Sequence, residues 1–348
     1  MLDISMEELR AAVFDMNPNK SLGVDGFPVL FFQKAWQLVK YNLLSLVQAA
    51  LRDGEINPAL NRTLVVLIPK ISGPERISQF RSISLCTVPL KIITKLLVDR
   101  LRPLLDNLVS RSQSSFVPGR HTTDNIIVVQ EAIHTMRTMK RKGGAIAIKV
   151  DLEKAYDRIK WSFLQQVLEE IQLPPPWVKL IMHIVSSNTF SLLWNGQQLP
   201  FFSSSRGIRQ GDPLSPYLFI LCLEKLGHLI DEEVRLNRWK SLQITQRGPS
   251  LSHVCFADDL VLFGEASFTQ LDLMMKVLND FCEASGEKVS LAKSKLLVSS
   301  DISHPIAMAL SNHCGIALTE DFGKYLGVTV VSMEFLGIKF VFPKSEVV

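Results

Sequence analysis

Phe256-Ala257-Asp258-Asp259 is the most informative stretch of the chain, because it holds two adjacent carboxylates between short apolar runs. The runs at 254–256 and 260–263 are rich in Val, Leu and Phe, which predicts two strands that meet at a tight turn. Two ionised Asp side chains repel each other and are costly to bury, so a divalent cation is their natural partner. Taken alone, the pattern also fits an ordinary Asp-rich turn without a ligand.

A third carboxylate occurs upstream in a matching setting. Residues 145–150 (AIAIKV) have the composition of a buried strand, and Asp151 follows them directly. Between the two acidic sites, residues 206–216 (RGIRQGDPLSP) predict a glycine-containing loop, and it leads into an apolar helix over 215–235. This order of acid-tipped strand, glycine-containing loop and acid-bearing hairpin resembles a polymerase palm.

Four further stretches extend the match: 80–85 (FRSISL), 113–120 (QSSFVPGR), 123–125 (TDN) and 324–327 (KYLG). Together with the acidic sites they resemble reverse transcriptases of non-LTR (LINE-type) retrotransposons, with the plant members nearest in wording. The resemblance covers roughly residues 17–328, in the correct order. It implies an RNA-directed DNA polymerase core that extends a DNA primer on an RNA template, with dNTPs as substrates.

Helical stretches alternate with short antiparallel strand pairs along the chain, so we expect an α+β fold. The resemblance implies the right-hand fingers and palm of a polymerase, with an antiparallel sheet and flanking helices in the palm and the thumb absent or incomplete. We expect an N-terminal extension over 1–60, fingers over 61–144, a palm over 145–328 into which 145–160 leads, and a divergent tail over 329–348. Because that tail departs from the family pattern, we expect a truncated or frame-shifted copy.

The composition indicates a globular chain. With 348 residues, 47% apolar residues and a mean hydropathy of +0.18, the chain can bury a sizeable core. Its longest apolar run, 218–223, is too short to cross a membrane, so we expect no membrane partner. The acidic N-terminus has no signal or transit peptide pattern, so the localisation is left unknown, nuclear or cytoplasmic if the chain is expressed. Five cysteines without paired spacing suggest a reducing compartment and exclude a Cys-x-x-Cys zinc site.

The charge is unevenly distributed along the chain. The net charge is +4 overall, but residues 61–160 hold 18 Lys and Arg against 8 Asp and Glu, a net of +10. A basic segment over the expected fingers and the start of the palm suits a protein that binds a phosphate backbone. An ordinary solvated surface is the alternative explanation.

The resemblance assigns the metal site to the acidic positions. It makes Asp151 and Asp258 the metal ligands, with the backbone carbonyl of Leu152 completing one site and Asp259 as the auxiliary acid. Oxygen ligands of this kind suit Mg²⁺, with Mn²⁺ as a substitute. Nucleotidyl transfer in such a site uses two cations about 3.5–4 Å apart.

The resemblance also assigns nucleotide-binding roles to three cationic side chains. Lys70 and Arg81 match the fingers cations that clamp the triphosphate, and Lys293 matches the general acid for the leaving pyrophosphate. For Lys293 a surface lysine without a role is the alternative. Asp157 and Asp212 are expected to make structural hydrogen bonds rather than to bind metal.

The remaining expected contacts with the nucleotide come from an aromatic ring and a loop. Tyr156 matches the aromatic residue under the incoming sugar, where it would clash with a 2′-hydroxyl, and a core tyrosine is the alternative. Gln210 and Gly211 match the loop that packs against nucleotide and template, and Gly211 allows a close backbone approach. Arg206 and Arg209 are expected either to contact phosphate or to lie in a solvated loop.

The chain departs from the family pattern at Ser82 and Leu22, where proline is usual, and at Ser290, where asparagine is common. None of these positions is an expected metal ligand. Besides the polymerase, two other functions stay open at this point. One is a catalytically inactive truncated remnant that at most binds RNA, and the other is an intron-maturase-like protein. The sequence identifies no protein partner.

Overall fold

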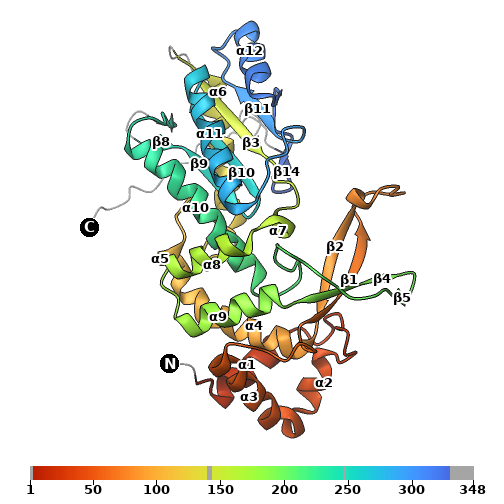
Figure 1. Cartoon of the computed structure of the whole chain (residues 1–348). Helices are drawn as coiled ribbons and strands as arrows, with labels where there is room; N and C mark the ends of the chain where they lie inside the picture. The colour runs from red at the N-terminus through yellow and green to blue at the C-terminus, as the bar shows by residue number, and fades with distance from the viewer. Residues whose placement is uncertain (1–2, 139–142, 246–247, 249, 330–348) are drawn as a thin grey trace.

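The chain is described by a computed structural model that covers residues 3–138, 143–245, 248 and 250–329. A group of N-terminal helices, a sheet projecting to one side and a larger sheet with flanking helices follow one another along the molecule (Figure 1). This mixture of helices and largely antiparallel sheets confirms the expected α+β fold. The expected tail over 329–348 falls almost entirely outside the described residues.

Three N-terminal helices pack together and against α4. The first is capped by Ser5, whose Oγ accepts a hydrogen bond from the Glu8 backbone N–H at 3.1 Å. The helical stretch that follows the first helix is interrupted at Ala35, and both of its halves contact the first helix. The elements are α1 (Met6–Asp15), α2 (Val29–Lys34), α3 (Trp36–Asp53) and α4 (Val88–Leu101).

The sheet that projects to the side of the molecule contains the expected fingers strands (Figure 1). Its strands are β1 (Arg62–Pro69), β2 (Phe80–Cys86), β4 (Thr189–Trp194), β5 (Gln197–Gln198) and β6 (Phe202–Ser203). β1 pairs antiparallel with β2 and parallel with β4. Asn195 and Gly196 form a two-residue turn in which both have positive φ (48° and 78°), a conformation that Asn-Gly favours. β4 belongs to the segment expected to form the palm, yet it pairs with β1 of the expected fingers. The division between fingers and palm at residue 145 therefore stays a prediction.

The larger sheet has β3 at its centre. The order is β12 (Ala317–Leu318), β11 (Lys295–Val298), β3 (Ala145–Val150), β10 (Asp259–Glu265) and β9 (His253–Phe256). β3 runs antiparallel to both of its neighbours, β10 and β11. The C-terminal end of β3 therefore lies beside the start of β10, where the sequence has its acids.

Both faces of this sheet are buried, and alternate residues of β3 and β10 serve the two faces. Ile146, Ile148 and Leu260 belong to the main core, which also contains the apolar residues of α8 (Trp161–Glu170), α10 (Ser215–Arg235) and α11 (Phe268–Ser285). Ala147 and Val261 belong to a second cluster on the other face, under α6 (Thr122–Thr138). Helices thus pack on both faces of the sheet behind the strand ends that bear the acids.

The other elements are short connections and helices at the periphery. No helix among the described residues is both long and apolar enough to cross a membrane. The remaining elements are α5 (Leu105–Leu108), α7 (Ala155–Arg158), α9 (Pro175–Ser186), α12 (His304–Cys314), β7 (Leu242–Gln243), β8 (Ser250–Leu251), β13 (Lys324–Tyr325), β14 (Val328–Thr329) and the 3-10 helices η1 (Ile77–Gln79) and η2 (Arg102–Leu104).

Candidate active site

The two strands around the acid pair form the hairpin that the sequence predicts. Phe256 of β9 pairs with Asp259 of β10, so Ala257 and Asp258 make a two-residue turn. Ala257 has φ = +51°, a left-handed conformation that an L-residue adopts only at a cost. Asp258 is exposed at the tip, whereas Asp259 is half-buried as the first residue of the strand. The two acids therefore differ in their surroundings.

Asp151 reaches the same place from the central strand. Val150, the last residue of β3, pairs with Leu260 of β10, so Asp151 follows beside Asp259. The Asp151 backbone N–H donates to Ser294 Oγ at 3.1 Å, and its carbonyl accepts from the Ser290 N–H at 2.8 Å. The backbone that carries Asp151 is thereby tied to the segment before β11.

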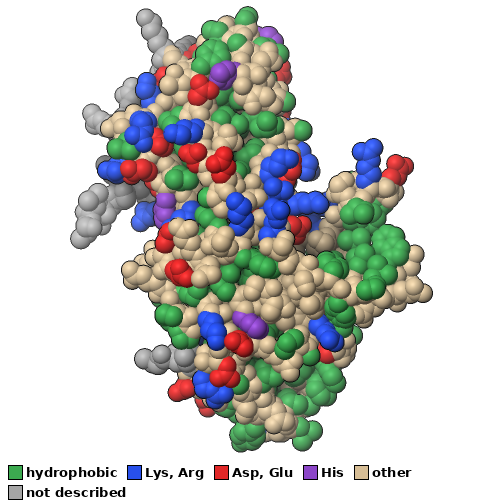
Figure 2. All heavy atoms as spheres, viewed as in Figure 1, with side chains coloured by type: hydrophobic (Ala, Val, Ile, Leu, Met, Phe, Trp, Pro, Cys, Tyr) green, Lys and Arg blue, Asp and Glu red, His purple; other side chains and the backbone are tan. Residues whose placement is uncertain are grey.

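The three acids line one cavity of about 200 Å³. Its wall also includes Leu152 and Lys293, so the structure brings together every residue expected at the metal site. The other lining residues are Lys149, Val150, Lys295 and Phe322. Figure 2 shows Lys and Arg side chains gathered across the middle of the face that it presents, between the palm and the fingers sheet.

The electrostatics of the cavity favour a bound cation. Burial raises the pKa of the Asp259 carboxyl, and the negative charges of Asp258 and Asp151 raise it further, while Lys149 lowers it. Asp151 Oδ1 is buried and has no hydrogen-bond partner within the part of the chain that the structure describes. The nearest cation to that oxygen is the exposed Lys293, with its Nζ 3.7 Å away. A buried, unpartnered carboxylate oxygen is suited to a metal ion.

The described residues contain no group of three His, Cys, Asp or Glu side chains close enough to form a complete metal cage. Mg²⁺ does not require one, because it is commonly held by one or two carboxylates together with waters and substrate phosphates. Leu152 and Val289 form an antiparallel bridge whose hydrogen bonds run from Glu153 N–H to the Lys288 carbonyl and from Ser290 N–H to the Asp151 carbonyl. The Leu152 carbonyl takes no part in these hydrogen bonds. The donor set fits a cation shared with a substrate.

Tyr156 lies on α7 between this cavity and the core. Its ring stacks on Phe219 of α10, with centroids 4.8 Å apart and planes 13° from parallel. Burial and the nearby charge of Asp258 both raise the pKa of the Tyr156 hydroxyl above its usual range. The half-buried ring thus packs against the core on one side, which fits a core tyrosine. Its hydroxyl is also near the charge of Asp258, which fits a ring that contacts the nucleotide.

The glycine-containing loop connects the palm to the fingers sheet. The Gln210 carbonyl accepts a hydrogen bond from the Ser84 N–H of β2 at 2.8 Å. Gly211 has φ = +123°, and a Cβ there would lie 2.6 Å from the Ser84 carbonyl oxygen. Gly211 therefore makes a close approach to the fingers backbone within the chain, while its expected approach to nucleotide and template stays a prediction.

Both expectations for Arg209 are wrong. Its side chain is buried, and Nη1 donates to Asn61 Oδ1 at 2.6 Å while Nη2 donates to the Ile184 carbonyl at 3.0 Å. An ion pair of 3.6 Å joins Nη2 to Asp212, whose Oδ1 also accepts from the Leu214 N–H. Arg209 ties the loop to α9 and to Asn61, the residue just before β1, and Asp212 has the structural role predicted for it.

Lys70 and Arg81 lie on the fingers hairpin, outside the acid-lined cavity. Arg81 pairs with Ile68, so Lys70, two residues further on, leaves the same face of the two strands. The charge of Lys70 is near enough to Asp157 to lower the pKa of that carboxyl, against the rise that desolvation causes. Both cationic side chains are exposed, and Lys70 Nζ donates a hydrogen bond to the Ser78 carbonyl at 3.4 Å.

Glu287 is a titratable group near the site that the sequence did not reveal. It is only 4% exposed, and neither of its carboxylate oxygens has a hydrogen-bond partner among the described residues. Burial raises the pKa of Glu287 to about 8, opposed by Arg158 and assisted by the charges of Asp258 and Asp157. Its position just after the left-handed Gly286 that ends α11 resembles an ordinary polar loop in the sequence.

Residues 68–340 match the family described as reverse transcriptase (RNA-dependent DNA polymerase). Fold and acidic cavity thus define a nucleic acid polymerase palm with its fingers, and the chain belongs to the reverse transcriptase family. The identification that rested on the acidic sites and the four sequence blocks is confirmed.

Similar proteins come from mobile elements. The chain is 26% identical over 333 residues to the "Transposon TX1 uncharacterized 149 kDa protein" of Xenopus laevis, covering 95% of this chain and 25% of that protein. It is 26% identical over 290 residues to the "Retrovirus-related Pol polyprotein from type-2 retrotransposable element R2DM" of Drosophila melanogaster, covering 83% of this chain and 26% of that protein. The chain thus spans about a quarter of the length of these two relatives.

A plant protein matches a shorter stretch at a higher percentage identity. The "Uncharacterized mitochondrial protein AtMg01250" of Arabidopsis thaliana is 45% identical over 65 residues, which is 19% of this chain and 53% of that protein. The relatives agree with the resemblance to non-LTR retrotransposon proteins and to their plant members.

Proposed function

We propose that the chain is the core of an RNA-directed DNA polymerase that extends a DNA primer on an RNA template by two-metal nucleotidyl transfer. The observation that carries the proposal is the single cavity lined by Asp151, Asp258 and Asp259 in a chain of the reverse transcriptase family. The Pol polyprotein among the similar proteins supports it. RNA template, DNA primer and dNTPs are the proposed partners.

Asp151 and Asp258 would hold Mg²⁺, or Mn²⁺ in its place, with the Leu152 carbonyl completing one site. When bound, the cations lower the pKa of the primer 3′-hydroxyl and neutralise charge that develops at the α-phosphate. Asp259 adds negative charge to the cavity from its half-buried position on β10. Burial is the first cause of its raised pKa, and cations bound beside it would lower that pKa by offsetting the neighbouring carboxylates.

The nucleotide would lie between the palm cavity and the fingers hairpin. Arg81 on β2 and Lys70, the residue just after β1, would bind the triphosphate. Lys293, 3.7 Å from Asp151, would protonate the leaving pyrophosphate. Its high exposure leaves it free to move toward a phosphate.

The sugar and base would meet Tyr156 and the loop at Gln210 and Gly211. A ring stacked flat on Phe219 cannot yield to a 2′-hydroxyl, so Tyr156 would favour dNTP over NTP. The hydrogen bond between Gln210 and Ser84 would hold the loop in register with the fingers strands. The basic segment 61–160 would bind the template and primer through phosphates, in the proposed fingers over 61–144 and the start of the palm.

Primer extension tests the proposal. The purified chain is incubated with a DNA primer on an RNA template, dNTPs and Mg²⁺, and product length is measured. Extension that requires Mg²⁺, stops on chelation and is resumed with Mn²⁺ is the expected result. RNA binding without extension at any Mg²⁺ or Mn²⁺ concentration would instead favour the inactive remnant.

A further inference from the structure

A strap formed by residues 109–115 lies along the outer edge of the palm sheet. It connects α5 to the region before α6, and Gln113 bridges Cys255 of β9 in parallel register. The Cys255 N–H donates to the Ser112 carbonyl at 2.7 Å, and the Ser114 N–H donates to the Cys255 carbonyl at 3.2 Å. The strap therefore extends the sheet beyond β9 and covers an edge that would otherwise be open.

The side chain of Gln113 reaches the turn that carries Asp258. Its Oε1 accepts hydrogen bonds from the Ser115 N–H at 2.9 Å and from the Ala257 N–H at 3.1 Å. Both partners are donors, so the oxygen rather than the nitrogen of the amide faces them. Gln113 is buried, and Ala257 is the turn residue with positive φ. One buried oxygen thus joins the strap to the strained turn.

The strap is itself firmly anchored. The Arg120 guanidinium donates to the carbonyls of Ser110, Val109 and Gln113, the last two at 2.9 and 2.6 Å. Ser110 also donates through its backbone N–H to buried Glu224 at 3.0 Å. These contacts fix the backbone from which the Gln113 side chain extends.

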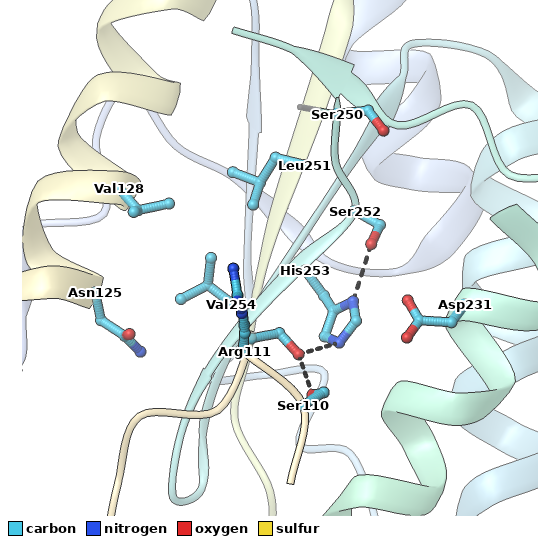
Figure 3. Close-up of a pocket in the computed structure, with 11 residues that line it drawn as sticks. Ser110, Arg111, Asn125, Val128, Asp231, Ser250, Leu251, Ser252, His253 and Val254 are labelled. Atoms are coloured by element: carbon cyan, nitrogen blue, oxygen red, sulfur yellow. Dashed lines mark hydrogen bonds between the residues drawn. The ribbon is translucent and has the colours of Figure 1, made fainter. Parts of the chain in front are cut away.

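A cavity of about 360 Å³ lies beside the strap and is walled by α6, α10 and β9 (Figure 3). At this cavity Ser112 Oγ is 2.8 Å from His253 Nε2 and 2.7 Å from Ser110 Oγ. His253 is four residues before Ala257 on the hairpin. Asn125 of α6 adds a bond from its Nδ2 to the Cys255 carbonyl at 2.7 Å. The strap thus holds β9 along its length, but only Gln113 reaches the turn.

We propose that Gln113 is a positioning residue for the acid-bearing turn, holding Asp258 in the cavity that it lines together with Asp151 through the hydrogen bond to the Ala257 N–H. The proposal rests on the proposed polymerase function. Without that bond the turn is free to relax from its left-handed conformation, and Asp258 moves with it. A displacement of about 1 Å at a catalytic group reduces a rate about a hundredfold.

The test compares three variants with the wild type. Gln113→Met keeps the length of the side chain and removes the acceptor, and Gln113→Asn keeps the amide but withdraws it from the turn. Ser112→Ala is the matched control, because it removes a strap contact to His253 and leaves the turn untouched. Mn²⁺ affinity is measured by electron paramagnetic resonance on the protein alone, and kcat and KM for dNTP by primer extension.

Both Gln113 variants are expected to bind Mn²⁺ about tenfold more weakly and to lose about tenfold to a hundredfold in kcat, with KM little changed. Ser112→Ala is expected to keep both values. Wild-type Mn²⁺ affinity in the Gln113 variants, or equal losses in Ser112→Ala, would overturn the proposal. If the wild type binds Mn²⁺ but does not extend a primer, the polymerase function fails, and the Mn²⁺ comparison still decides the role of Gln113. Gln113→Asn supplies the result if Gln113→Met does not fold.

Discussion

Replacement of Glu287 by Gln is expected to change how the stability of the protein depends on pH. The carboxyl is 4% exposed, and neither of its oxygens has a partner among the described residues. Burial raises the pKa of Glu287 from 4.5 to about 8. Between these two values the folded state holds a proton on Glu287 that the unfolded state has released. The contribution of protonated Glu287 to the free energy of unfolding is therefore fully present below pH 4.5 and is lost as the pH rises toward 8.

The size of the effect follows from the same values. Each pKa unit corresponds to about 1.4 kcal/mol, so a rise from 4.5 to about 8 costs about 4–5 kcal/mol once the pH exceeds 8. Part of that loss has already occurred at pH 6. Between pH 6 and pH 8 the wild type should lose about 2 kcal/mol of unfolding free energy through this group. Glu287→Gln carries no titrating proton and should not show that loss.

The assay is denaturant unfolding at pH 6, 7 and 8, followed by circular dichroism, for the wild type and Glu287→Gln. Glu283→Gln serves as the matched control, since Glu283 is exposed in the last turn of α11. The difference between wild type and Glu287→Gln should grow by about 2 kcal/mol across this range, and the control should follow the wild type. Parallel pH profiles for the wild type and Glu287→Gln would refute the assignment of a raised pKa to this carboxyl.

Three further changes test the loop and the ring. Arg209→Met leaves buried Asp212 without its cation and should lower the unfolding free energy by about 3 kcal/mol or more, measured by denaturant titration. Gly211→Ala should cost about 1–3 kcal/mol and slow primer extension, because its Cβ would meet the Ser84 carbonyl at 2.6 Å, whereas Gly196→Ala, with open space around it, should leave extension unchanged. Tyr156→Ala should raise the ratio of kcat/KM for NTP to that for dNTP, and an unchanged ratio in an active, folded variant would return the ring to a purely structural role.

Local features of the fold could be predicted from the sequence. The acid-bearing hairpin, the strand before Asp151 and the Asn195-Gly196 turn depend on neighbouring residues, and the structure has all three. The helix over 215–235 has the predicted bounds for the same reason. The order of these elements along the chain was enough to predict that the acids meet at neighbouring strand ends.

Features that depend on distant residues could not be predicted in this way. Arg209 is buried because Asn61 and Ile184, which are remote in sequence, supply its acceptors. Glu287 is buried by the packing around α11, and its sequence context is that of a polar loop. Gln113 stood within a recognised block, but its contact with Ala257 spans the strap and the hairpin.

The most direct test of the metal-site assignment is the rate of single-nucleotide addition by Asp258→Asn on an RNA-templated DNA primer with Mg²⁺. The amide keeps the shape of the side chain and removes its charge, so a loss of about 4 kcal/mol of transition-state stabilisation should slow addition roughly a thousandfold. Asp280→Asn, an exposed acid on α11 outside the cavity, should react at the wild-type rate. A wild-type rate for a folded Asp258→Asn would contradict the assignment of Asp258 as a metal ligand in nucleotidyl transfer.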